Sequence, residues 1–121
     1  GQRNFEVDRA PTIDQDTFPY AATSNASVQD VLREGNPVRV KVSGILTSGC
    51  QELSNRIQVQ KVDDVYIVLP VLTIRRGVLC TESIRPFERT LELGEPEEGH
   101  YLVHVRSMSG KAISRVFEVV R

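Results

Sequence analysis

The sequence predicts an all-β protein, an antiparallel sandwich of about seven strands preceded by an extended N-terminal arm. Short segments of alternating apolar and polar residues recur at near-regular intervals with turn residues between them, and no convincing helical pattern separates them. The chain of 121 residues, 40% hydrophobic and 26% charged, is long enough for one domain to bury a core without a metal. We therefore expect an arm over residues 1–26 and a single domain over residues 27–121.

The N-terminal arm lacks a sustained period of either 2 or 3.6 residues and contains the small polar run ATSNAS. This composition is typical of an extended tether. Three aromatic residues, Phe5, Phe18 and Tyr20, interrupt its polar character. They could dock on the domain, or one or two of them could simply cover an exposed sheet edge.

The predicted strands follow from alternation. Val38, Val40 and Val42 alternate with polar residues, the period of 2 expected where one face of a sheet is buried and the other is wet. Residues 65–69 are apolar on both faces, which favours a central strand that follows a turn at Asp63-Asp64. Residues 28–33 fit either a helical turn or a first edge strand. The other predicted strands cover residues 57–60, 87–93, 101–105 and 117–119.

The two cysteines, Cys50 and Cys80, fall at predicted loop positions, where two strand ends of a sandwich can meet. A bond between them would close a loop of about 31 residues and contribute roughly 3 to 4 kcal/mol by chain entropy. It would also indicate an oxidising compartment. Two unrelated buried thiols are an alternative, as is a metal or redox pair, although only His100 and His104 could add metal ligands and no CxxC is present.

Three sequence elements resemble a known family. They are VSGILTSGCQEL, GVLCTESIRPFERTLEL and EEGHYLVHV, which share the patterns G-x-L-x-x-G-C-x-x-L, C-T-x-x-x-x-P-F and G-x-Y-x-V-x-V. Over residues 37–120 the chain resembles the immunoglobulin-like β-sandwich domain of bacterial secreted proteins and lipoproteins. The resemblance implies an extracytoplasmic location, whether periplasmic, cell-surface or secreted, and a binding or accessory role without general enzymatic activity. The connection SMSGKAISRV is longer than the short turn usual in that family.

The resemblance also indicates structural residues. Pro86 and Phe87 belong to its second element, and Gly99 and Tyr101 to its third. Tyr101 opens an alternating strand, as in a tyrosine corner, where the hydroxyl bonds a backbone group a few residues upstream. The alternative is an ordinary core tyrosine.

The sequence lacks the usual signals of catalysis, nucleic-acid binding and membrane insertion. The net charge of −1 provides no general attraction for nucleic acid or anionic lipid, and no apolar stretch approaches the roughly 20 residues of a membrane span. The sequence contains no GxSxG, HExxH, Walker or dinucleotide motif. We therefore expect no enzymatic activity, cofactor or metal, while a lipid tether upstream of residue 1 is compatible with the sequence.

A partner surface is predicted on the strand that carries Tyr101. Leu102, His104 and Arg106 point away from its inward row and form a mixed apolar and basic stripe. We expect a noncatalytic module that binds an unknown protein or ligand at the cell envelope. The alternative is a proteinase inhibitor that presents loops from the sandwich, because Arg85-Pro86-Phe87 faintly resembles a loop of the chagasin-like inhibitors.

Overall fold

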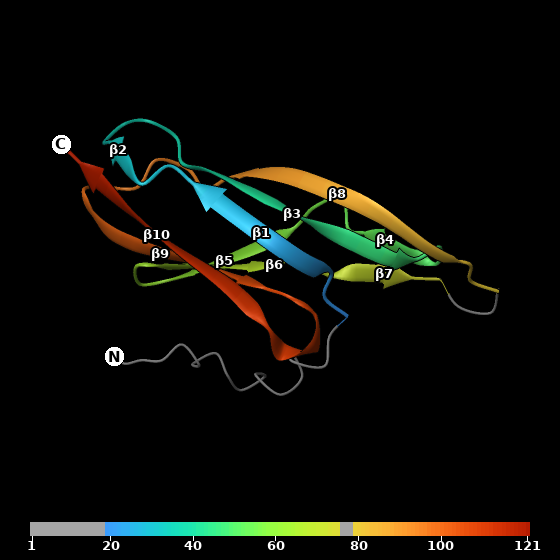
Figure 1. Cartoon of the computed structure of the whole chain (residues 1–121). Coiled ribbons are helices and arrows are strands. Elements are labelled where there is room, and N and C mark those ends of the chain that lie inside the picture. The colour runs from blue at the N-terminus through green and yellow to red at the C-terminus, as the bar shows by residue number, and fades with distance from the viewer. Residues whose placement is uncertain (1–18, 76–78) are drawn as a thin grey trace.

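The computed structural model describes residues 19–75 and 79–121, which form ten strands and one short 3-10 helix (Figure 1). The helix η2 (Met108–Gly110) lies between the last two strands. In chain order the strands are β1 (Ala22–Val28), β2 (Val31–Arg33), β3 (Arg39–Ser48), β4 (Gln51–Leu53), β5 (Gln58–Val62), β6 (Val65–Leu69), β7 (Leu72–Ile74), β8 (Glu82–Glu92), β9 (Gly99–Arg106) and β10 (Ala112–Val120). The all-β prediction is confirmed. The count exceeds seven partly because β4 and β7 have three residues each, too few to show an alternation.

The strands form the two layers of a sandwich. One sheet has the order β1-β3-β8 and the other the order β2-β10-β9-β6-β5. In Figure 1 the first sheet runs above the second, and the small β4-β7 sheet lies at the end away from the C-terminus. The predicted sandwich is therefore confirmed.

Two strand pairs run parallel. β6 pairs with β9 in parallel, and β2 pairs with β10 in parallel, while the other pairs are antiparallel. The turn at Asp63-Asp64 joins β5 to β6 as predicted, and the second strand of this hairpin is the one that joins β9. Within residues 28–33, the edge-strand alternative is correct, because Val31–Arg33 forms β2.

The core lies between the two sheets. β3 buries Val40 and Val42 and exposes Arg39 and Lys41, as the alternation predicts. The inward row of β9 is likewise buried. β8, in the same sheet as β3, adds Phe87 to the core. From the facing sheet, the core receives Tyr66, Val68, Tyr101, Val103, Val105, Phe117 and Val119. Each sheet therefore directs every second side chain of its longer strands into one shared cluster, and the intervening side chains remain on the outer faces.

The structured part of the chain begins earlier than the predicted boundary at residue 27. Ala22–Val28 forms β1, an edge strand on β3, and Tyr20 is only 2% exposed. The period was hidden because the segment is built from small residues and because a register shift between Thr23 and Asn25 interrupts it. Residues 1–18 of the predicted arm, with Phe5 and Phe18, lie outside the described residues.

Tyr20 covers part of the outer face of the five-stranded sheet. Its ring packs with Ile67 and Leu69 of β6, and its backbone forms an antiparallel bridge to Val71. This explains why β6 is buried on both faces. Tyr20 therefore docks on the domain and covers part of a strand face.

The long connection between β9 and β10 holds the first strand in place. Ser107 is buried, and its Oγ accepts a hydrogen bond of 2.9 Å from the backbone N–H of Thr23. The turn is then closed by η2, where Ser109 adopts a positive φ of 61°. The connection that departs from the family pattern therefore ties the β9-β10 hairpin to β1.

Candidate functional site

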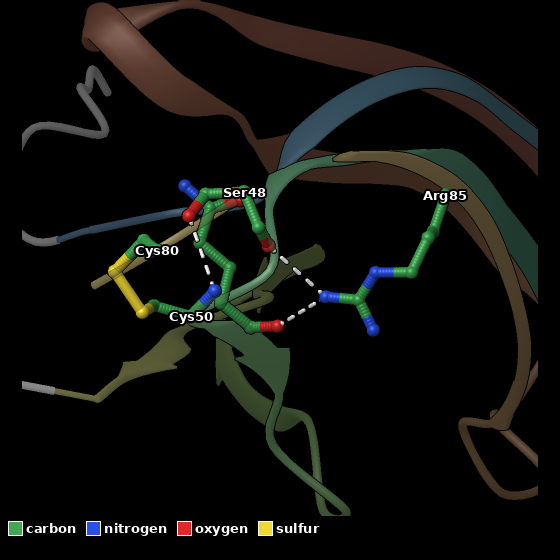
Figure 2. Close-up of a disulfide and its surroundings, with 5 residues drawn as sticks. Ser48, Cys50, Cys80 and Arg85 are labelled. Atoms are coloured by element: carbon green, nitrogen blue, oxygen red, sulfur yellow. Dashed lines mark hydrogen bonds between the residues drawn. A yellow bond between two sulfur atoms is a disulfide. The ribbon is translucent and has the colours of Figure 1, made fainter. Parts of the chain in front are cut away.

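The first candidate region is the disulfide-bonded end of the sandwich. Cys50 and Cys80 form a disulfide with a Cα–Cα distance of 5.3 Å, which confirms the predicted bond (Figure 2). It fastens the segment before β8 to the β3-β4 turn. Because both sulfur atoms are used in this bond, the alternatives of unrelated thiols and of a metal pair are wrong for this state of the protein.

Hydrogen bonds reinforce the same end. The Ser48 Oγ accepts from the Cys50 backbone N–H at 3.1 Å, and the Gly49 N–H donates to the Thr81 carbonyl at 2.8 Å. Figure 2 shows the Arg85 guanidinium reaching across the turn. Its Nη2 donates to the carbonyl oxygens of Ser48 and Gln51 at 3.0 and 2.7 Å. These bonds fix backbone groups, so the region is built for rigidity.

The residues Arg85-Pro86-Phe87 lie within β8, where they pair with β3. Phe87 is buried opposite Gly44, and Pro86 lies opposite Ile45. Proline is tolerated because β8 is an edge strand. With Arg85 engaged by backbone carbonyls, these three residues do not form the projecting loop that the inhibitor resemblance requires.

Tyr101 has the geometry of a tyrosine corner. Its hydroxyl donates a 2.7 Å hydrogen bond to the carbonyl of Glu97, four residues upstream. The ring stacks on Phe117 at 5.2 Å, and a Cβ at Gly99, which has a φ of 156°, would lie 3.6 Å from the Tyr101 ring. Burial, followed by the carboxylates of Asp64 and other acidic residues, raises the pKa of Tyr101, so the hydroxyl remains a donor. Its role is structural.

The second candidate region is an open groove on the outer face of the five-stranded sheet. Strand register aligns Val65 of β6 with Leu102 of β9, and Leu102 with Val116 of β10. Val65 and Leu102 are half-buried, whereas Val116 is 68% exposed. These three aliphatic side chains form the floor of a groove of about 670 Å³, which we call the outer groove.

Acidic residues line one end of the outer groove. Asp30, Asp64 and Glu118 contribute to its lining, together with His100, Tyr101 and Phe117. We call the three carboxylates the acidic rim. The backbone sets their positions, because the Glu118 N–H donates to the Asp30 carbonyl at 2.8 Å and the Leu102 N–H donates to the Asp64 carbonyl at 3.0 Å.

The predicted partner stripe divides between the groove and its surroundings. Leu102 lies in the floor, but His104 and Arg106 follow farther along β9 and do not line the groove. The His104 Nδ1 lies 3.1 Å from the Ser114 Oγ, and burial, followed by the charge of Arg106, lowers the pKa of His104. The acidic rim was not predicted from the sequence.

Among the described residues, no group of three or more His, Cys, Asp or Glu side chains is arranged to hold a metal ion. In the same part of the chain, no helix is long and apolar enough to cross a membrane.

Comparison with known proteins identifies the family. Residues 40–119 match the family model of the ORF11 β-sandwich domain, which covers more than half of the chain. The chain therefore belongs to the ORF11 β-sandwich domain family. No curated protein and no solved structure matches significantly.

Proposed function

We propose that this member of the ORF11 β-sandwich family is a noncatalytic module that binds a partner protein at the bacterial cell envelope through its outer groove. The observation that carries the proposal is the row of Val65, Leu102 and Val116, in which Val116 is largely exposed and the other two are half-buried. These aliphatic side chains are aligned across three adjacent strands, and removing them from water would lower the free energy of a complex with a partner. Such a row in a groove with a polar rim is typical of an interaction site.

The location outside the cytoplasm is supported by the disulfide. Bonds of this kind persist in oxidising compartments and are rare in the cytosol. Arg85 and Ser48 hold the surrounding backbone, which is consistent with a structural bond rather than a catalytic one. The bacterial, secreted and lipoprotein associations come from the sequence resemblance, and a tether upstream of the domain would keep the module at the envelope.

The noncatalytic role is supported by the lining of the outer groove. None of its described lining residues is serine, threonine or cysteine. The one hydroxyl in the lining belongs to Tyr101, and it is engaged by the Glu97 carbonyl. The contact between His104 and Ser114 lies outside the groove, on the outer face of the paired strands β9 and β10. No observation favours the proteinase-inhibitor alternative.

The test is site-specific photo-crosslinking in the cells from which the sequence derives. A photoreactive p-benzoylphenylalanine replaces Val116 in the groove, and in a matched control it replaces Thr90, an exposed residue on the other sheet. We expect a discrete crosslinked partner in the envelope fraction only with the probe at 116, and we expect Leu102→Asp to abolish it. Equal crosslinking from both positions, or none from 116, would refute the proposal.

The compartment is tested separately. Cells are quenched in acid and treated with a thiol-reactive maleimide under denaturing conditions. We expect no added label on Cys50 or Cys80, because both are bonded in an oxidising compartment. Two labels per chain on the protein in its own cells would contradict the extracytoplasmic location, whatever the crosslinking shows.

A further inference from the structure

We propose that the outer groove takes a basic polypeptide segment, with an apolar side chain seated on Val65, Leu102 and Val116 and a lysine or arginine beside it meeting the acidic rim. This inference rests on the proposed binding function and adds the chemical class of the partner. It is carried by the position of the carboxylates relative to the apolar floor.

The apolar floor favours a ligand that carries an apolar side chain over a simple ion. It extends over β6, β9 and β10, a width of roughly 10 Å at the usual spacing of strands. Tyr20 already covers the neighbouring part of the same face by packing on Ile67 and Leu69. A bound aliphatic or aromatic side chain would extend this covering along the sheet by one residue row.

The acidic rim favours a ligand that carries a cationic group. Within the described part of the chain, no cationic side chain forms an ion pair with Asp30 or Asp64. The third member, Glu118, has only His100 at 3.8 Å, an imidazole that is 84% exposed. Lys61 is the cation nearby, with its Nζ 5.9 Å from the centre of the Tyr101 ring. A guanidinium or ammonium group at this end of the groove would therefore meet carboxylates that form no ion pair with a lysine or arginine of the described residues.

The same charges disfavour the other occupants. Anionic lipid surfaces and nucleic acid would be repelled by the rim. A second copy placed face to face would bring two acidic rims together. Residues 1–18 of the chain itself contain four acidic and two basic residues, so this segment does not complement the rim either. Among the occupants considered, a basic segment from another protein is the one that complements both floor and rim.

The test is selection from a random 12-residue peptide library displayed on phage, against the immobilised, disulfide-bonded domain at low salt. The library is also selected against Leu102→Asn and against Val116→Ser, which remove apolar contact without adding a charge. Position 116 is largely exposed, so the Val116→Ser variant remains folded even if Leu102→Asn does not. We expect enriched peptides to combine lysine or arginine with an apolar residue, and to bind both variants at least tenfold more weakly than the wild type.

The rim is tested with one enriched synthetic peptide by fluorescence anisotropy. The double variant Asp30→Asn/Asp64→Asn should weaken binding about three- to tenfold, consistent with exposed charge pairs. Raising the salt concentration should remove most of this difference. The control Glu82→Gln removes an exposed charge from the first sheet and should leave the affinity unchanged.

The outcomes separate the two proposals. Enriched acidic or uncharged peptides, affinities unaffected by the rim variant, or equal binding of spermine and peptide would overturn the basic-segment inference, while crosslinking at position 116 could still uphold a binding function. No enrichment above background would likewise overturn the inference. Basic peptides that bind the groove without any crosslinked partner in cells would support the ligand chemistry and count against the envelope function.

Discussion

At its disulfide-bonded end the molecule fixes the backbone with several bonds, whereas on the outer face of the five-stranded sheet it leaves Val116 largely exposed and Leu102 half-buried. The Cys50–Cys80 bond, the two carbonyls held by Arg85 and the Gly49–Thr81 hydrogen bond all act on one turn. Within residues 19–75 and 79–121, no comparable ties act on the side chains of Leu102 and Val116, which line a groove. The contrast indicates that one region maintains the fold and the other is available for binding.

The strongest test of this contrast removes the disulfide. The double variant Cys50→Ser/Cys80→Ser should lower the free energy of unfolding by about 3 to 4 kcal/mol. The reason is that the unfolded chain is no longer constrained by a crosslink between two residues 30 positions apart. Urea denaturation followed by circular dichroism measures the loss. Amide NMR signals of Val65, Leu102 and Val116 should keep their positions in the folded variant.

The control for this variant is the wild type under a strong reductant, which should lose a similar amount of stability. A loss below about 1 kcal/mol would mean that the bond adds little to the other ties at this end. Large shifts of the groove signals would break the comparison itself, because the two regions would then be coupled.

The second test adds one methyl group between β1 and β3. A Cβ at Gly44 would lie 2.8 Å from the Thr23 Cα and would also collide with the Ala22 carbonyl oxygen. Gly44→Ala should therefore cost about 2 to 3 kcal/mol of unfolding free energy, since two paired strands must separate to accept it. Thermal and urea unfolding measure the loss.

Gly35→Ala is the matched comparison. Gly35 has a φ of 95° but nothing within 4 Å of an added Cβ, so this variant carries only the conformational cost of about 1 to 2 kcal/mol. A Gly44→Ala loss no greater than that of Gly35→Ala would show that β1 yields easily, and that the β1–β3 contact does not belong to the rigid part of the fold.

The sequence predicts the strands whose large apolar residues alternate. Val40 and Val42 in β3, and Val103 and Val105 in β9, show the period of 2 because their side chains dominate the core. β1 escapes prediction because Ala22 and Ala26 contribute little apolar area, and because the close approach at Gly44 becomes visible only once the strands are paired.

The candidate site depends on register, which the sequence does not contain. Leu102 was predicted to be outward from alternation alone. Val65 reaches it because β6 joins β9 in parallel, and Val116 reaches it because β10 joins β9 antiparallel; another register would give Leu102 different cross-strand neighbours. Asp30 and Asp64 lie in turns, so their place at the groove follows from the same pairings. The disulfide was predictable because two cysteines allow one intramolecular bond.

The smallest expected effect lies on the outer face and concerns pH. Burial, and then the nearby charge of Arg106, lowers the pKa of His104 in the folded protein below its ordinary value of 6.5. As the pH falls below 6.5, the unfolded chain therefore binds a proton at this position first, and the folded state loses stability until His104 itself is protonated. The loss is absent above that range. It should be well below the contribution of the disulfide.

The variant His104→Gln should remove this component, so the free energy of unfolding between pH 7 and 5 should fall less steeply than in the wild type. Urea denaturation at several pH values measures the slope. Arg106→Gln keeps the imidazole but removes the second cause, so its slope should lie between the other two. Identical slopes in all three proteins would mean that burial does not lower the pKa of His104. The outer face around β9 would then be as accessible to water as the groove floor beside it. A pH-dependent change in the free energy of unfolding as large as that caused by removing the disulfide would show instead that this face belongs to the rigid part of the fold.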